Sequence, residues 1–201
     1  MFSYDLFNGI PQTPSIYLSH RNLKKGNVLP MTSDIVVIPS NKNGYQLTFV
    51  LHKMESGKEN WMWNKINNLS YVFIPGFGYF ELDVPISDGT ELSKTITGIG
   101  IGQAELGQCN CTLQINTEDD IARDDYVITK FYSEDNPNGS LLDRTLSYAP
   151  HWSIGHVDES LKNIQRTFSC DDSSVYDFFN ATVSDEINCI FDFDNFSRII
   201  N

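Results

Sequence analysis

Basic residues are scarce in this sequence. It has 14 lysines and arginines against 26 aspartates and glutamates, a formal net charge of −12 at pH 7. Binding to nucleic acid rests largely on Lys and Arg side chains that neutralise phosphates, and attraction to anionic lipid headgroups needs the same side chains. The shortage of positive charge therefore argues against specific nucleic-acid binding and against docking on an anionic membrane.

Long apolar runs are also lacking. No segment of the 201 residues approaches the ~18 consecutive apolar residues that indicate a membrane-spanning helix. The first residues, MFSYDLFNGIPQTP, have neither the basic start nor the apolar stretch of a signal peptide. We therefore expect neither a membrane partner nor a secretory signal.

Cysteines number four, Cys109, Cys111, Cys170 and Cys189, which is too few and too scattered for a disulfide framework. Cys109 and Cys111 stand one residue closer than the usual zinc or redox spacing, and no second Cys/His pair follows nearby in the sequence. In a strand both side chains would share one face, as small buried hydrophobes. We expect no metal and no cofactor.

Two histidines raise the question of a metal site in the motif PHWSIGH. His151 and His156 are five positions apart, whereas a zinc-protease helix places its histidines four apart with a glutamate between them. Gly155 argues against a helix here. The motif is better interpreted as architecture, in which Trp152 and Ile154 anchor a core and the histidines are partly exposed.

Catalytic signatures are incomplete. Residues 102–109, GQAELGQC, resemble a phosphate-binding loop, but Gln108 and Cys109 stand where the chemistry needs a lysine and a hydroxyl. No G-x-S-x-G nucleophile motif occurs. Residues 117–125, TEDDIARDD, are rich in carboxylates, and an acid/base pair requires one of them desolvated and another ionised. We predict no catalytic, cofactor-binding or metal-ligating residue, and no enzyme activity in this chain.

The first two-thirds of the chain has strand-like patterns. In residues 45–54, YQLTFVLHKM, the apolar side chains of Leu47, Phe49 and Leu51 alternate with other residues and predict one buried face. Residues 70–84 predict a hairpin around the turn GFG. In residues 91–106, ELSKTITGIGIGQAEL, glycines occupy alternate positions. One face of the predicted strand therefore lacks side chains at these positions, and another backbone or a bulky side chain can lie close against it.

The last third changes to a helical period after a polar, turn-rich linker at residues 131–139. Ser140 and Asp143 predict the start of a helix that ends at Pro150. A second helix is predicted over residues 175–187, capped by Asp172 or Ser173.

We therefore predict an α+β protein with a β domain over residues 1–130, a linker over 131–139 and a small α+β domain over 140–201. Because the chain ends inside what should be its final strand, we expect the second domain to be truncated at its C-terminal end.

Residues 140–201, SLLDRTLSYAPHWSIGHVDESLKNIQRTFSCDDSSVYDFFNATVSDEINCIFDFDNFSRIIN, resemble the central part of tail hub proteins from phages and prophages of Gram-positive bacteria, often labelled tail spike or prophage endopeptidase tail. The stretches PSIYLSHRNLKKGNVL, YQLTFVLHKMESGKENWMWNKINNLSYVFIPGFGYFELD and KTITGIGIGQAELGQCNCTL are similar to the N-terminal part of such proteins. The resemblance spans residues 14–201 and is distributed along the chain, without a chemical motif.

The resemblance implies an N-terminal antiparallel β-barrel of the tail-tube type followed by a peripheral α+β domain. It implies a structural component of the tail tip or baseplate, a hub ring that joins the tail tube and the distal tail protein to the tip machinery. Distal tail protein, tail tube and tape measure would be its partners, the full-length assembly a homotrimer, and its location the virion tail, assembled in the cytoplasm of the bacterial host. Any peptidase or glycosidase would lie in a C-terminal region beyond this chain.

Two other functions stay open from the residues alone. A cell-wall polysaccharide-binding module would need exposed aromatic side chains, and Trp61, Trp63, Tyr71 and Tyr79 are the candidates for such a platform. A cell-wall hydrolase would need an Asp/Glu pair in a cleft.

Overall fold

A computed structural model describes residues 14–39, 44–86, 90–113, 129–134, 140–162, 164–166, 168 and 170–201. The acidic run at 117–125 and residues 135–139 of the predicted linker lie outside these residues. The structure is mostly sheet with few helices, an α+β arrangement. The chain separates into two compact units, Met1–Ile101 and Gly102–Asn201.

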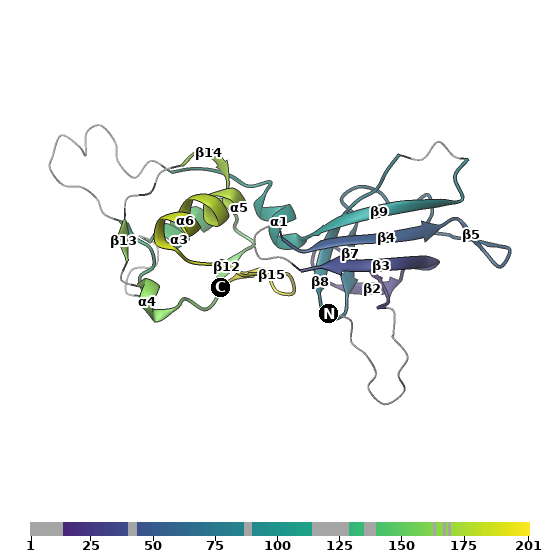
Figure 1. Ribbon diagram of the computed structural model, residues 1–201, viewed down its shortest axis with the longest axis horizontal. Coiled ribbons are helices and arrows are strands. Elements are labelled where there is room, and N and C mark those ends of the chain that lie inside the picture. The colour runs from purple at the N-terminus through teal and green to yellow at the C-terminus, as the bar shows by residue number, and fades with distance from the viewer. Residues whose placement is uncertain are drawn as a thin grey trace, which may run out of the picture. The chain divides into compact units, whose positions relative to one another are not determined.

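The first unit is built on one antiparallel sheet of seven strands in the order β2-β1-β7-β8-β9-β4-β3. Strands β9, β4 and β3 of this sheet lie side by side in Figure 1. Its strands are β1 (Tyr17–Ser19), β2 (Lys25–Val28), β3 (Thr32–Ile38), β4 (Gln46–His52), β7 (Tyr71–Ile74), β8 (Gly78–Asp83) and β9 (Ser93–Gly100). A short hairpin of β5 (Met54–Glu55) and β6 (Lys58–Glu59) extends beyond β4.

Two sequence predictions for this sheet are confirmed. Leu47, Phe49 and Leu51 all point into the core of the unit. The hairpin of β7 and β8 forms around the predicted turn, where Gly76 and Gly78 take positive φ angles of 82° and 94° that other residues rarely adopt.

The predicted close approach over the glycines of β9 is confirmed at Gly98. This residue lies opposite Leu47 of β4 and Leu82 of β8. A Cβ atom there would stand 3.0 Å from the Glu81 carbonyl oxygen and 3.0 Å from a methyl carbon of Leu82. The missing side chain therefore lets the neighbouring strands and their leucines approach. Gly102 was wrongly assigned to the same strand, because β9 ends at Gly100 and a helix begins at Ile101.

The seven-stranded sheet is strongly curled. Its two edge strands, β2 and β3, are joined by only three residues, so the chain spans at most about 14 Å between them. A flat sheet of seven strands would hold its edges about 29 Å apart. The Leu29 N–H donates to the Ile16 carbonyl at one edge, and two residues later the Met31 carbonyl accepts from the His52 N–H at the other. The sheet must bend to bring these strands together.

A buried asparagine holds this crossover. The side-chain nitrogen of Asn60 donates to the carbonyls of Pro30, at 3.1 Å, and His52, at 2.9 Å. Its side-chain oxygen accepts from the Met62 N–H at 2.9 Å. Asn60 therefore satisfies three backbone groups with one side chain and ties the crossover to the end of β4. In the described part of the chain no strand pair joins β2 to β3, so the predicted closed barrel is not found.

The boundary between the units falls after Ile101, the first residue of α1 (Ile101–Leu106), so the rest of this helix belongs to the second unit. The second unit also contains seven strands within the described residues. Its strands are β10 (Asn110–Leu113), β11 (Thr129–Lys130), β12 (Ser153–Ile154), β13 (Gln165–Arg166), β14 (Cys170–Ser174), β15 (Phe193–Asp194) and β16 (Ile199–Ile200). They form the pairs β10–β14 and β11–β13 and the small sheet β12-β16-β15. Its helical segments are α3 (Leu141–Leu146), α4 (Glu159–Lys162), α5 (Val175–Asp177), the π-helical η2 (Phe178–Val183) and α6 (Ser184–Ile187).

The sequence predicted one domain over residues 1–130, whereas the two compact units of the structure are Met1–Ile101 and Gly102–Asn201. Strand β10 ends at Leu113 and pairs with β14, which begins 57 positions later at Cys170, and both strands lie in the second unit. The predicted boundary at residues 131–139 rested on the polar, turn-rich composition of that segment. Composition does not show which strands pair with one another.

The capping predictions are partly correct. Ser140 caps α3 as predicted, with its hydroxyl accepting from the Asp143 N–H. Helix α3 ends at Leu146, before Pro150, and turns follow. Asp172 and Ser173 were the wrong caps for the last helix, because that helix begins at Val175. Ser174, the residue directly before it, is the cap and accepts from the Asp177 N–H.

Replacement of Asn60 by alanine should destabilise the first unit by about 2–4 kcal/mol, because it removes three hydrogen bonds to buried or partly buried backbone groups. Urea denaturation followed by circular dichroism would measure the loss. Asn64 is exposed and serves as the matched control, since its replacement by alanine should change stability by less than about 0.5 kcal/mol. Equal effects of the two substitutions would contradict the role assigned to Asn60.

Candidate functional site

The motif PHWSIGH is an architectural element of the second unit. Trp152 is buried, and its indole N–H donates to the Glu105 carboxylate on α1 at 3.1 Å. The same carboxylate receives two hydrogen bonds from the Arg198 guanidinium, each at 2.6 Å, in the paired geometry that strengthens such contacts. Trp152, Glu105 and Arg198 thus tie the loop before β12 and the turn before β16 to α1.

Gly155 has a packing role that the sequence did not reveal. A Cβ atom at this position would lie 2.4 Å from a methyl carbon of Ile199 and 2.3 Å from the side-chain oxygen of Asn201. The Gly155 N–H donates to the Ile200 carbonyl at 2.8 Å, which aligns β12 beside β16. Glycine is therefore required by the close approach of the last residues of the chain.

The two histidines of the motif take different positions. His151 lies in the exposed turn after α3. His156 is exposed, and its backbone N–H donates to the Asn201 side-chain oxygen at 2.9 Å. In the part of the chain that the structure describes, no group of three or more His, Cys, Asp or Glu side chains is arranged to hold a metal ion.

An apolar pocket of about 250 Å³ opens in the second unit, and His156 stands at its rim. Most of its lining is apolar, from Phe131, Leu142, Leu146, Ile154, Val157, Leu161, Phe179, Cys189, Ile190, Phe191 and Ile200. Four polar residues complete it: His156, Asp158, Asp192 and Asn201. We regard this pocket as the candidate functional site.

Six separate segments of the second unit contribute to the lining of the pocket. Helix α3 contributes Leu142 and Leu146, which face the core as its helical period predicts. The π-helical segment contributes Phe179, whose ring stacks on Phe191 with 4.8 Å between centroids. Ile190, three-quarters exposed, extends the apolar surface out of the pocket. Sequence reasoning missed the site because its residues come from distant segments and each looks like an ordinary core residue.

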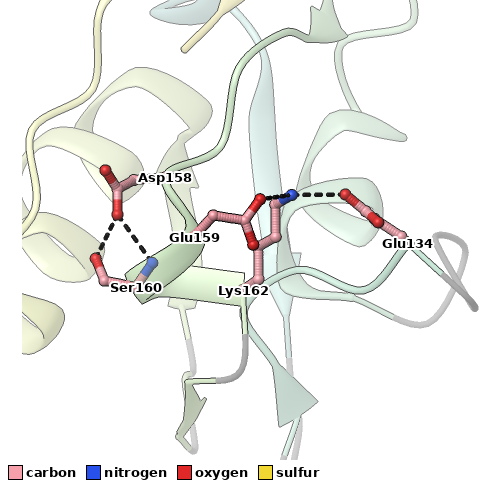
Figure 2. A network of polar contacts seen from close by, with 5 residues as sticks. All are labelled: Glu134, Asp158, Glu159, Ser160 and Lys162. Atoms are coloured by element: carbon pink, nitrogen blue, oxygen red, sulfur yellow. Dashed lines mark hydrogen bonds and ion pairs between the residues drawn. The ribbon is translucent and has the colours of Figure 1, made fainter.

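The loop and helix beside the pocket carry a small polar network (Figure 2). Asp158 accepts from both the backbone N–H and the hydroxyl of Ser160 at the start of α4, and these hydrogen bonds, the hydroxyl's first, lower the pKa of its carboxyl. The Lys162 ammonium donates to Glu134 and to Glu159, each at 2.6 Å. These contacts, with Glu134 foremost, raise the pKa of Lys162. Asp158 therefore stays ionised, and Lys162 forms its ion pairs with Glu134 and Glu159.

The cysteines do not occupy the arrangement expected from their spacing. Cys109 precedes β10, and its thiol donates to the Glu105 carbonyl. Cys111 is fully buried and faces Cys170 of β14, with 3.3 Å between the two sulfur atoms. Burial, a hydrogen bond with Cys170 and the proximity of that thiol raise the pKa of Cys111 to about 12. No sequence pattern predicts this pair, because its two cysteines are 59 positions apart.

The proposed aromatic platform for polysaccharide is not assembled. Trp61 is 53% exposed, whereas Trp63, Tyr71 and Tyr79 are buried, at 3%, 4% and 9%. The Trp63 ring lies beneath the buried Lys94 ammonium, 4.7 Å from its centroid, and Tyr79 donates its hydroxyl hydrogen to the Leu23 carbonyl. Three of the four candidates are thus structural.

Comparisons with family models, with curated proteins and with solved structures found no match to this chain. Among the described residues, no helix is both long enough and apolar enough to cross a membrane.

Truncation of Trp152 to alanine should lower the stability of the second unit by about 3–5 kcal/mol, since it removes a buried aromatic ring and leaves Glu105 with one donor fewer. Guanidinium denaturation monitored by circular dichroism would measure this. The matched control is Trp61→Ala, which removes an exposed ring and should cost about 1 kcal/mol or less. A Trp152→Ala protein as stable as the control would refute the architectural assignment.

Proposed function

We propose that this protein is a structural component of a phage or prophage tail tip, a hub that joins the tail tube and distal tail protein to the tip machinery. In this proposal the first unit is a domain of the tail-tube type and the second a peripheral α+β domain. The distributed sequence resemblance over residues 14–201 is its starting point.

The curl of the seven-stranded sheet is the observation that carries the proposal. A tube-type domain is a barrel or a strongly bent sheet, and here the three-residue crossover forces β2 and β3 toward one another. Both edge strands leave one side of their backbone unpaired within the described residues, and β2 is exposed along its whole length. Such edges are available for pairing with other chains.

On this proposal the chain itself performs no catalysis, and its function is to join rigid surfaces. Its partners are the distal tail protein, the tail tube and the tape measure, and the full-length assembly is a homotrimer. The acidic composition agrees with this, because a net charge of −12 disfavours adhesion to DNA that passes through a tail.

Immunogold electron microscopy would test the proposal. Particles induced by DNA damage from a bacterial strain that carries the gene would be labelled with antibodies raised against this chain. We expect gold at the distal end of the tail, and no gold on particles from a strain in which the gene is deleted. Label on the capsid, or tails without label, would overturn the proposal.

A further inference from the structure

We propose that the apolar pocket of the second unit receives one large apolar side chain from a partner protein, and that a Lys or Arg of the same partner segment pairs with the carboxylates at its rim. The kind of partner, another protein of the tail, rests on the proposed function. The contact itself rests on the size, charge and backbone surroundings of the pocket.

The size of the pocket selects a single side chain. Its volume of about 250 Å³ exceeds that of a cavity of roughly 150 Å³ that admits benzene. It falls below the range, from roughly 300 Å³ upward, of sites for larger organic ligands. One aromatic or branched aliphatic group therefore fits.

The charge of the rim selects a basic neighbour for that group. Asp158 and Asp192 are exposed carboxylates of the lining, and the described lining includes no Lys or Arg. Lys162 does not neutralise them, because its ammonium is held between Glu134 and Glu159. A positive charge beside the bound side chain would thus meet complementary charge.

The backbone beside the pocket favours a polypeptide over a small molecule. Strand β12, which contributes Ile154 to the lining, lies at the edge of the sheet β12-β16-β15. One side of an edge strand is not paired within its sheet, and an extended segment can add there as a further strand. Such a segment would place alternate side chains toward Ile154 and the pocket.

Capped tripeptides would test the proposal on the full chain labelled with ¹⁵N. Acetyl-Lys-Phe-Lys-amide should shift the amide signals of residues 154–158 and 189–192. Acetyl-Lys-Ala-Lys-amide lacks the anchor and should bind at least about tenfold more weakly. Acetyl-Glu-Phe-Glu-amide keeps the anchor but reverses the charge, and it should also bind more weakly.

Charge variants would then separate the two parts of the contact. The substitutions Asp158→Asn and Asp192→Asn should each reduce the preference for the basic peptide by about two- to fivefold. Asp185→Asn, on the exposed surface of α6 and outside the lining, is the matched control and should leave it unchanged.

Equal binding of the three peptides, or shifts confined to other residues, would overturn the pocket proposal. Gold at the tail tip together with this negative result would leave the proposed function intact. Selective binding without gold at the tail tip would overturn the proposed function but not the contact.

The thiols of Cys111 and Cys170 meet inside the second unit, on the paired strands β10 and β14. The two sulfur atoms are 3.3 Å apart, both side chains are buried, and both thiols are free. We also propose that these thiols form a disulfide when the protein meets a two-electron oxidant such as dioxygen or a diazene. The bond would lock β10 to β14.

The reaction joins the two sulfur atoms and releases two protons and two electrons, which the oxidant takes up. A diazene becomes a hydrazine, and dioxygen becomes hydrogen peroxide. Thiolate is the reacting form, so the high pKa of Cys111 predicts slow oxidation in the folded protein.

Treatment of the native chain with diamide would test this inference. Thiol titration after unfolding should fall from the four free cysteines to two, and peptide mapping should show Cys111 linked to Cys170. The oxidised protein should melt at a higher temperature than the reduced one.

Cys111→Ser should abolish both the cross-link and this increase in melting temperature. The control Cys189→Ser, which removes a thiol outside the pair, should preserve them. Four thiols that remain free, or a cross-link between other cysteines, would overturn the inference.

Discussion

The crossover between β2 and β3 constrains the whole first unit. Three residues carry the chain from one edge of a seven-stranded sheet to the other, and Asn60 ties Pro30, within that link, to His52 at the end of β4. The sheet can satisfy this constraint only by bending, and a bent sheet needs room on its concave face. Gly98 supplies that room between Leu47 and Leu82. The curled sheet, the buried Asn60 and the missing side chain at Gly98 all follow from the short link between β2 and β3.

The second unit depends on a different kind of interaction. Its strands are short, most of them two residues long, so hydrogen bonds between strands contribute little on their own. Packed aromatic rings and the contacts of Glu105 with Trp152 and Arg198 hold the segments together. Between these segments lies the pocket, because rigid rings and a wide π-helical turn do not fill all the space they enclose.

Both units offer surfaces suited to association. The first has open sheet edges within its described residues, and the second has an apolar pocket with an acidic rim beside an edge strand. The proposed structural role would use features of this kind, because a protein that joins other proteins needs surfaces to which they can bind. The proposed disulfide between Cys111 and Cys170 would strengthen the second unit from inside, because both thiols are buried away from those surfaces.

The sequence by itself determined the local structure: the buried face of β4, the hairpin at Gly76 and Gly78, and the cap at Ser140. Each follows from side-chain period or backbone freedom within a few residues. Tertiary structure alone decided the pairing of β10 with β14, the need for glycine at Gly155, the meeting of Cys111 with Cys170, and the pocket. These depend on which distant segments become neighbours, and a local pattern holds no information about a partner many residues away.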